Sequence, residues 1–146
     1  MLVRDLIKRK GSAVAAAPPE TTVAALLDLL AEHRIGAVVV SADGGGTVDG
    51  IVSERDVVRA LRTAGAALLD APISDVMTAD VVVSAPGDTV EDLMRLMTER
   101  RIRHVPVVGD DGRLAGIISI GDVVKSRIDE LEADRDQLIG YIHSSG

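Results

Sequence analysis

With 146 residues and no phenylalanine, tryptophan or cysteine, the chain is long enough for one compact domain, or for two small ones that share an aliphatic core. Its 16 basic and 23 acidic residues give a net charge of −7, which disfavours binding to nucleic-acid backbones, and its composition offers no aromatic surface for stacking bases. The lack of cysteine excludes disulfides, thiol catalysis and cysteine-ligated zinc, and no apolar run approaches the roughly 20 residues of a membrane span. We therefore expect a cytoplasmic protein that binds neither nucleic acid nor membrane.

The chain consists of two copies of one pattern. Residues 22–27 match residues 89–94, and residues 35–40 match residues 102–107 at the same separation. The separation shortens by one residue further along, at a glycine-containing turn, where a change in length costs least. Such self-similarity is typical of a repeated structural unit. We predict a first repeat over residues 1–65, a second over 66–128 and a helical tail over 129–146.

A capped amphipathic helix is predicted near the start of each copy, after an extended segment (residues 13–17 and 80–84). Thr22 in the first copy, and Asp88 or Thr89 in the second, are residue types that cap helix N-termini. The residues that follow place apolar side chains at i, i+3, i+4 and i+7, the spacing of a helix packed on one face. These positions are Val23, Leu26, Leu27 and Leu30 in the first copy and Val90, Leu93, Met94 and Met97 in the second.

Two short β-branched runs around a turn follow each of these helices and predict paired strands. The runs are residues 37–40 with 48–52, and residues 104–108 with 114–118. A second helix begins near Ser53 in the first copy and near Ser119 in the second. Each copy is thus a β-α-β-β-α unit that would leave one face of its sheet bare, and two units packed together can cover it. We predict an α+β fold of two such repeats in pseudo-twofold symmetry.

The sequence pattern of the tail predicts that the last helix continues over residues 123–142. Its apolar residues form a stripe along one side, while acidic and basic residues occupy the rest. The stripe consists of Val124, Ile128, Leu131, Leu138, Ile139 and Ile142. Such a stripe needs cover, which leaves two alternatives: the helix packs back on its own domain, or it packs against a second subunit.

The motif Gly-h-h-Ser-x-x-Asp-h, where h is apolar, occurs in both copies, at residues 50–57 and 116–123. A serine hydroxyl and free N–H groups at a helix start favour phosphate, and an aspartate one turn later can accept both hydroxyls of a ribose. The same serine and aspartate also form a near-capping box, with aspartate in the place of the usual glutamate or glutamine. The recurrence of the glycine, where a close backbone approach would require it, favours a ligand-binding role.

On these residues the repeats resemble CBS domains, named after cystathionine β-synthase, which occur in pairs as regulatory modules. The resemblance covers residues 1–128 and implies two clefts, in which the aspartate of one repeat holds a ribose and the other repeat holds the adenine. For the first cleft it implies Ile51, Ser53, Arg55, Asp56, Val81, Val82, Arg103, His104, Val105 and Pro106. For the second it implies Ile117, Ser119, Asp122, Ala15, Ala16, Gly36, Ala37 and Val38.

The two implied clefts differ in charge. Arg55, Arg103 and His104 belong to the first cleft, near the expected phosphates. The equivalent positions of the second cleft hold Gly121, Gly36 and Ala37. We therefore expect the first cleft to hold the more phosphorylated ligand, or to hold it more tightly. We interpret residues 8–10 as a solvated basic loop, with contact to an extra phosphate as the alternative, and residues 44–46 as a flexible turn.

The resemblance implies a nucleotide sensor that has no catalytic residues, no metal site and no catalytic cofactor. Family members bind AMP, ADP, ATP, NAD or S-adenosylmethionine; for this chain we expect AMP or ATP first and NAD(H) next. Paired repeats of this type resemble those that form disk-shaped homodimers, and a chain without an effector domain would signal through a separate protein partner. The alternative is an interaction scaffold that binds no ligand.

Overall fold

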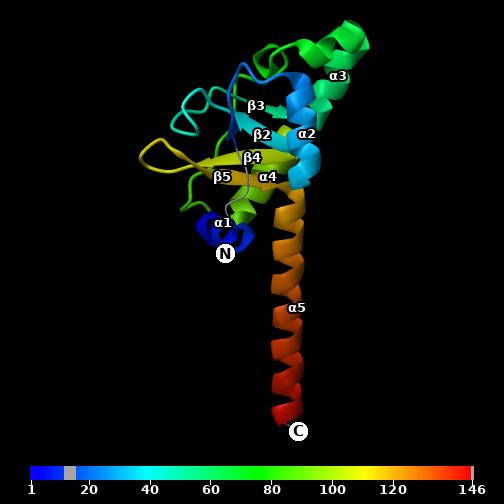
Figure 1. The fold of residues 1–146 in the computed structure, drawn as a ribbon. Helices are drawn as coiled ribbons and strands as arrows, with labels where there is room; N and C mark the ends of the chain where they lie inside the picture. The colour runs from blue at the N-terminus through cyan, green and yellow to red at the C-terminus, as the bar shows by residue number, and fades with distance from the viewer. Residues whose placement is uncertain (12–15, 146) are drawn as a thin grey trace.

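The molecule consists of two helix-and-sheet units and one long projecting helix (Figure 1). It is described here by a computed structural model, which covers residues 1–11 and 16–145. The elements in chain order are α1 (Val3–Lys10), β1 (Ala16–Ala17), α2 (Val23–His33), β2 (Ala37–Val40), β3 (Gly50–Ser53), α3 (Glu54–Ala64), the 3-10 turns η1 (Gly65–Asp70) and η2 (Ile73–Asp75), α4 (Val90–Arg100), β4 (His104–Val108), β5 (Leu114–Ser119) and α5 (Ile120–Ser145). The predicted α+β fold with a C-terminal helical extension is confirmed.

Each unit contains a small sheet. In the first, the strand order is β1-β2-β3, with β1 parallel to β2 and β3 antiparallel to it. The second contains the antiparallel pair β4-β5. The extended segment expected over residues 80–84 forms no strand and makes a single bridge, from Ser84 to Val107. The reason is that residues 80–82 turn toward a cleft instead of following the sheet edge.

Threonine caps begin both first helices. The Oγ1 atoms of Thr22 and Thr89 accept the third backbone N–H of α2 and α4 at 3.1 and 3.0 Å. Of the two residues proposed as the second cap, Thr89 is therefore the cap, while Asp88 accepts hydrogen bonds from the preceding turn. Both helices end at an arginine in the left-handed conformation, Arg34 and Arg101, with φ of 52° and 54°.

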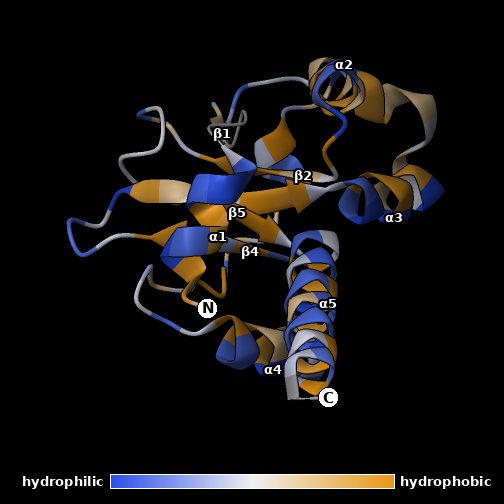
Figure 2. Ribbon diagram, turned by 90° about the horizontal axis from the view of Figure 1, so that it is seen from below, coloured by the Kyte–Doolittle hydropathy of each residue, from blue (hydrophilic) through white to orange (hydrophobic). Residues whose placement is uncertain are grey.

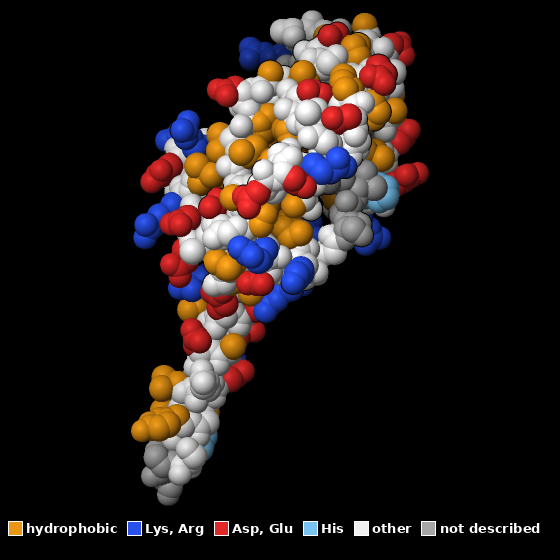
Figure 3. Space-filling model, turned by 90° about the vertical axis from the view of Figure 1, so that its left-hand side faces the viewer, with side chains coloured by type: hydrophobic (Ala, Val, Ile, Leu, Met, Phe, Trp, Pro, Cys, Tyr) orange, Lys and Arg blue, Asp and Glu red, His pale blue; other side chains and the backbone are white. Residues whose placement is uncertain are grey.

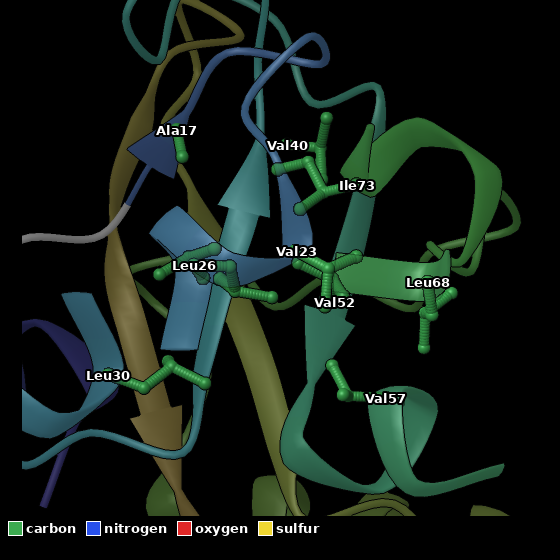
Figure 4. Close-up of a cluster of buried hydrophobic side chains, with 10 residues drawn as sticks. Ala17, Val23, Leu26, Leu30, Val40, Val52, Val57, Leu68 and Ile73 are labelled. Atoms are coloured by element: carbon green, nitrogen blue, oxygen red, sulfur yellow. The ribbon is translucent and has the colours of Figure 1, made fainter. Parts of the chain in front are cut away.

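Each unit has its own aliphatic core, and each core is completed by a segment that precedes the other copy in the sequence. Ile73 of η2 is fully buried in the core of the first unit, while Val3 and Leu6 of α1 are buried in the core of the second. The first core consists of Ala17, Val23, Leu26, Leu30, Val38, Val40, Val52, Val57, Leu68 and Ile73 (Figure 4). The predicted boundaries between the repeats and the tail, at residues 65/66 and 128/129, stay a prediction. In space, the segment that opens each copy packs on the unit formed by the other copy.

The strands are mainly apolar and lie between helices whose outer turns carry hydrophilic residues (Figure 2). The units are also joined by a backbone hydrogen bond from Leu114 N to Gly45 O at 2.8 Å. The turn that contains Gly45 is tied down as well, because Asp43 Oδ1 accepts from Ser41 Oγ and Thr47 N, both at 2.8 Å. These hydrogen bonds, that of Ser41 foremost, lower the pKa of Asp43. Residues 44–46 thus lie in a turn, as expected, and their flexibility stays a prediction.

Helix α5 begins on the second unit and then leaves it (Figures 1 and 3). Val123 and Ser126 in its first turns are buried, but every described side chain from Leu131 to Ser144 is exposed. Packing of the tail on its own domain, one of the two alternatives above, is therefore wrong for this stretch, because the 26-residue helix α5 continues straight past the edge of the unit after its first turns. Within the described residues, no helix combines the length and the apolar character that a membrane crossing demands.

Candidate functional site

Two cavities are lined by residues of both units, and each is lined by the serine and the aspartate of one predicted motif. The first cleft has a volume of about 420 Å³ and the second about 630 Å³, both within the range of small-molecule sites, about 300–1,000 Å³. The predicted residues that line the first cleft are Ile51, Ser53, Arg55, Asp56, Val81, Val82, Arg103 and His104. Those that line the second are Ala16, Gly36, Ala37, Ile117, Ser119 and Asp122.

Three further predicted residues are not among those that line a cleft. Val105 and Pro106 are buried, because β4 is covered on both faces along its middle. Val38 is fully buried for the same reason, since β2 is buried along its whole length. Their part in ligand binding stays a prediction, and Ala15 lies outside the described residues.

In the first motif, Ser53 and Asp56 form a capping box at the start of α3. Asp56 Oδ2 accepts from Ser53 N at 2.8 Å and from Ser53 Oγ at 3.0 Å, and Ser53 Oγ accepts from Asp56 N at 3.4 Å. Over the described part of the chain, Oδ1 of Asp56 accepts no hydrogen bond from the protein. One carboxylate can therefore cap the helix through Oδ2 and still offer Oδ1 to a hydroxyl donor in the cleft.

In the second motif, Ser119 and Asp122 make the same reciprocal pair at the start of α5. Asp122 Oδ2 accepts from Ser119 N at 2.8 Å, and Ser119 Oγ accepts from Asp122 N at 3.1 Å. Lys10 adds an ion pair, because its Nζ lies 2.8 Å from Asp122 Oδ2 and also donates to Ile117 O at 2.7 Å. The basic residues 8–10 are thus the last turn of α1, and their interpretation as a solvated loop is wrong.

The ion pair decides the ionisation of Asp122. Burial is the largest single influence on its pKa and acts to raise it. The hydrogen bond from Lys10, the N–H of Ser119 and the charge of Lys10 together outweigh burial and hold the pKa of Asp122 below its ordinary value. The carboxylate is therefore ionised at neutral pH.

His104 lies between the two clefts and lines both. A Cβ on Gly36 would stand 3.0 Å from its Nε2, so the ring packs closely on the backbone at that residue. Burial first, and then the charge of Lys10, lower the pKa of His104 below 6.5. The ring is therefore neutral at pH 7, and it offers hydrogen bonding to a ligand rather than the positive charge expected for it.

Several residues that line the clefts escaped the sequence reasoning. In the first cleft they include Arg59, Thr78, Asp80, Arg100, Arg101 and Ile102. In the second they include Ile7, Lys10, Arg34, Gly45 and Leu114. The arginines at the end of α4 could have been inferred from their place just before Arg103. For Lys10, the sequence offered phosphate contact as the alternative role, but its pairing with Asp122 depends on the docking of α1 on the other unit, which no local pattern indicates.

The recurrent glycine of the motif has a packing role within the chain. A Cβ on Gly50 would stand 2.6 Å from Met77 Sδ and 2.9 Å from the backbone carbonyl oxygen of Thr78. A Cβ on Gly116 would stand 2.8 Å from Ile7 Cδ1. The close backbone approach expected there is thus made by the exchanged opening segments, which explains the glycines without a ligand.

Comparison with known proteins gives matches in both repeats. The family model of the CBS domain matches residues 3–63 and 73–129. A mitochondrial CBS domain-containing protein of Arabidopsis thaliana is 32% identical over 147 residues, which cover 96% of this chain and 71% of that protein. The crystal structure of a CBS-domain containing protein from Agrobacterium tumefaciens is similar with a TM-score of 0.80 and 47% identity, covering 87% of this chain and 99% of that one. A CBS domain protein from Pyrobaculum aerophilum, complexed with AMP, has a TM-score of 0.74 and 28% identity, and covers 84% and 89% of the two chains.

Proposed function

This chain belongs to the CBS-domain family, and we propose that it is a regulatory module that binds an adenine nucleotide between its two units. The observation that carries the proposal is that Ser53 and Asp56 line one cleft while Ser119 and Asp122 line the other. Each pair stands at a helix start, where free N–H groups favour anions. The relative from Pyrobaculum aerophilum that is complexed with AMP supports the ligand class.

In the first cleft, the lining residues suggest a role for each part of a nucleotide. The free Oδ1 of Asp56 is available to the ribose hydroxyls. Ile51, Val81 and Val82 are partly buried and present aliphatic surface to the flat faces of adenine. The phosphates would lie among the guanidinium groups at the rim, which belong to Arg55, Arg59, Arg100, Arg101 and Arg103.

The charge of the first cleft supports AMP or ATP as the first choice of ligand and NAD(H) as the next. Besides its arginines, that cleft contains the acidic residues Glu54, Asp56 and Asp80. The second cleft offers Lys10 and Arg34 as its basic residues. We therefore retain the proposal that the first cleft holds the more phosphorylated ligand, or holds it more tightly.

A second copy of the chain is the partner that we propose for the exposed apolar residues of α3 and α5. Val58 and Val124 occupy equivalent positions of the two repeats and are 66% and 46% exposed. Farther along α5, Ile128, Leu131 and Leu138 are exposed as well. Figure 3 shows hydrophobic side chains on the surface of the projecting helix. Val124, Ile128 and Leu131 alternate spacings of four and three residues, which is the pattern of a seam between two helices. The same helix in a second copy fits such a seam.

Signalling requires that the nucleotide bind one arrangement of the units, or of the dimer, more tightly than another. We propose that a separate effector protein reads the change. We place this role in the cytoplasm, since a chain without cysteine suits a reducing compartment. Fractionation of the source cells tests that placement.

The second candidate function is a scaffold that binds no ligand. It is favoured by the two complete capping boxes, because helix stability alone would retain Ser53, Asp56, Ser119 and Asp122. The two functions differ in one measurable respect: only the sensor gains stability from a nucleotide that binds the folded state.

A thermal-shift screen of the purified protein against AMP, ADP, ATP, NAD, NADH and S-adenosylmethionine tests the proposal. We expect an adenine nucleotide to raise the melting temperature and the Asp56→Asn variant to lose about tenfold or more in affinity, since a charged acceptor contributes about 1.5–3 kcal/mol. Glu91→Gln, an exposed acid on α4 that lines neither cleft, is the matched control. If no nucleotide stabilises the wild type, the scaffold is the better reading.

A further inference from the structure

The second cleft contains an ion pair that has no counterpart in the first. Lys10 Nζ donates to Asp122 Oδ2 at 2.8 Å and to Ile117 O at 2.7 Å. The side chains of Lys10 and Asp122 are 24% and 26% exposed, so the pair lies in the cleft wall and not on open surface. Ionic hydrogen bonds in such a place are stronger than those of an exposed pair.

The matched carboxylate of the first cleft has different partners. Asp56 Oδ2 accepts from Ser53 N and from Ser53 Oγ, whereas at Asp122 the serine keeps only the backbone bond and Lys10 provides the second donor. Over residues 1–11 and 16–145, no basic nitrogen comes within ion-pair distance of Asp56.

The exchanged opening segments account for this difference. Ile7 stands against Gly116 of the second motif, and Met77 stands against Gly50 of the first, so the two segments occupy equivalent places. Three residues after Ile7 comes Lys10, which lines the second cleft, and three residues after Met77 comes Asp80, which lines the first. These matched sequence positions therefore bring opposite charges to the two clefts.

We propose that Lys10 makes the second cleft selective for a phosphorylated adenosine, which rests on the function proposed above. Over the described residues, Oδ1 of Asp122 accepts no hydrogen bond from the protein, so a ribose can use Oδ1 while Lys10 stays on Oδ2. The ammonium group has three N–H donors, of which two are used by Asp122 and Ile117. The third donor is available to a 5′-phosphate in the same cleft, and the flexible stem of Lys10 lets its charge turn toward it.

Binding of adenosine and of AMP therefore distinguishes the two clefts. Adenosine offers Lys10 no anion, while the phosphate of AMP pairs with it. Lys10 does not line the first cleft, so it has no influence on the preference there.

Titrations of the ¹⁵N-labelled full-length protein with adenosine and with AMP test this inference. The amide signals of Ser53 and Asp56 report on the first cleft, and those of Ser119 and Asp122 on the second. We expect AMP to bind the second cleft about tenfold more tightly than adenosine. In Lys10→Met, that ratio falls about tenfold because AMP binds more weakly, and the ratio at the first cleft is unchanged.

Two further variants control for effects on folding and on general charge. Lys8→Met removes an exposed lysine from the same helix and keeps the wild-type ratio at both clefts. Lys10→Arg keeps the charge and retains the preference for AMP, and Lys10→Gln replaces the methionine variant if the latter does not fold.

The outcomes distinguish this inference from the proposed function. An unchanged ratio at the second cleft in Lys10→Met overturns the role of Lys10, as does a second cleft that binds neither ligand, while binding at the first cleft leaves the proposed function standing. If neither compound shifts the signals of either cleft in any variant, the proposed function fails and this inference fails with it.

Discussion

Alanine at Gly50 probes the contact between the first motif and the exchanged segment after η2. Its Cβ would stand 2.6 Å from Met77 Sδ and 2.9 Å from Thr78 O. The sulfur belongs to a flexible side chain and can move aside, but the carbonyl is part of the backbone. Ile51 N donates to Thr78 O at 2.9 Å, and Thr78 N donates to Ile51 O at 2.8 Å. Any retreat of Thr78 therefore weakens two hydrogen bonds at once.

The expected loss of stability follows from these contacts. Two backbone hydrogen bonds contribute about 1 kcal/mol each, and alanine returns about 0.4–1 kcal/mol by restricting the unfolded chain. Gly50→Ala should therefore lower the free energy of unfolding by about 1–3 kcal/mol, in line with the cost of overpacking. Gly116→Ala should cost less than about 1 kcal/mol, because its Cβ meets only Ile7 Cδ1, at 2.8 Å.

Urea unfolding followed by circular dichroism measures both variants, with an unchanged slope as the sign that the unfolded state is the same. Ile7→Val removes the atom that Gly116→Ala would meet, so the double variant should be more stable than the sum of the two single losses indicates. Equal losses at Gly50 and Gly116, or no loss at Gly50, would refute the reasoning and return the glycines to a ligand-binding role.

Three further predictions concern the caps, the buried histidine and the tail. Thr22→Ala and Thr89→Ala should each lower the free energy of unfolding by about 1 kcal/mol in urea melts, because each hydroxyl caps its helix; no loss would contradict this. The pKa of His104 is lowered in the folded protein. The unfolded chain therefore takes up the proton first, and stability falls as the pH drops below 6.5. His104→Gln should reduce this pH dependence in melts between about pH 7 and 5, and an unchanged pH dependence would assign it to other groups. Leu131→Glu, on the exposed part of α5, should convert a dimer into a monomer in analytical ultracentrifugation with little change in melting temperature; a persistent dimer would exclude α5 as the seam.

Local chemistry in the sequence was sufficient to predict the strand pairs, the two capping boxes and every helix but α1 among α1 to α5. Helix periodicity identified α2 and α4, and Thr22 marked the start of α2 correctly. Ser53 and Asp56 were predicted as a unit because the cap and the ligand contact both depend on residues one helical turn apart. These features rest on neighbours within a few positions of the chain, which a sequence displays directly.

The residues of the clefts were harder to predict because they depend on burial and on contacts between units. Val38 and Val105 belong to strands that are covered on both faces, so that only the strand ends reach a cleft. Arg101 was not assigned to a cleft, but it ends α4 in the left-handed conformation, with φ of 54°, and lines the first cleft. The pairing of Lys10 with Asp122 could not be predicted, because α1 docks on the unit farther from it in the sequence.

The two clefts share the residues that come from the repeated motif. They differ in the residues that come from the exchanged opening segments. Duplication of the motif gives each cleft a serine and an aspartate in a capping box, and these cannot change without a cost to a helix. The opening segments contribute Lys10 to one cleft and Asp80 to the other, and neither residue caps a helix. Substitution at either position therefore alters the charge beside a motif aspartate while the capping boxes keep their partners. Ligand preference in one cleft can thus diverge from that in the other at little cost to the fold.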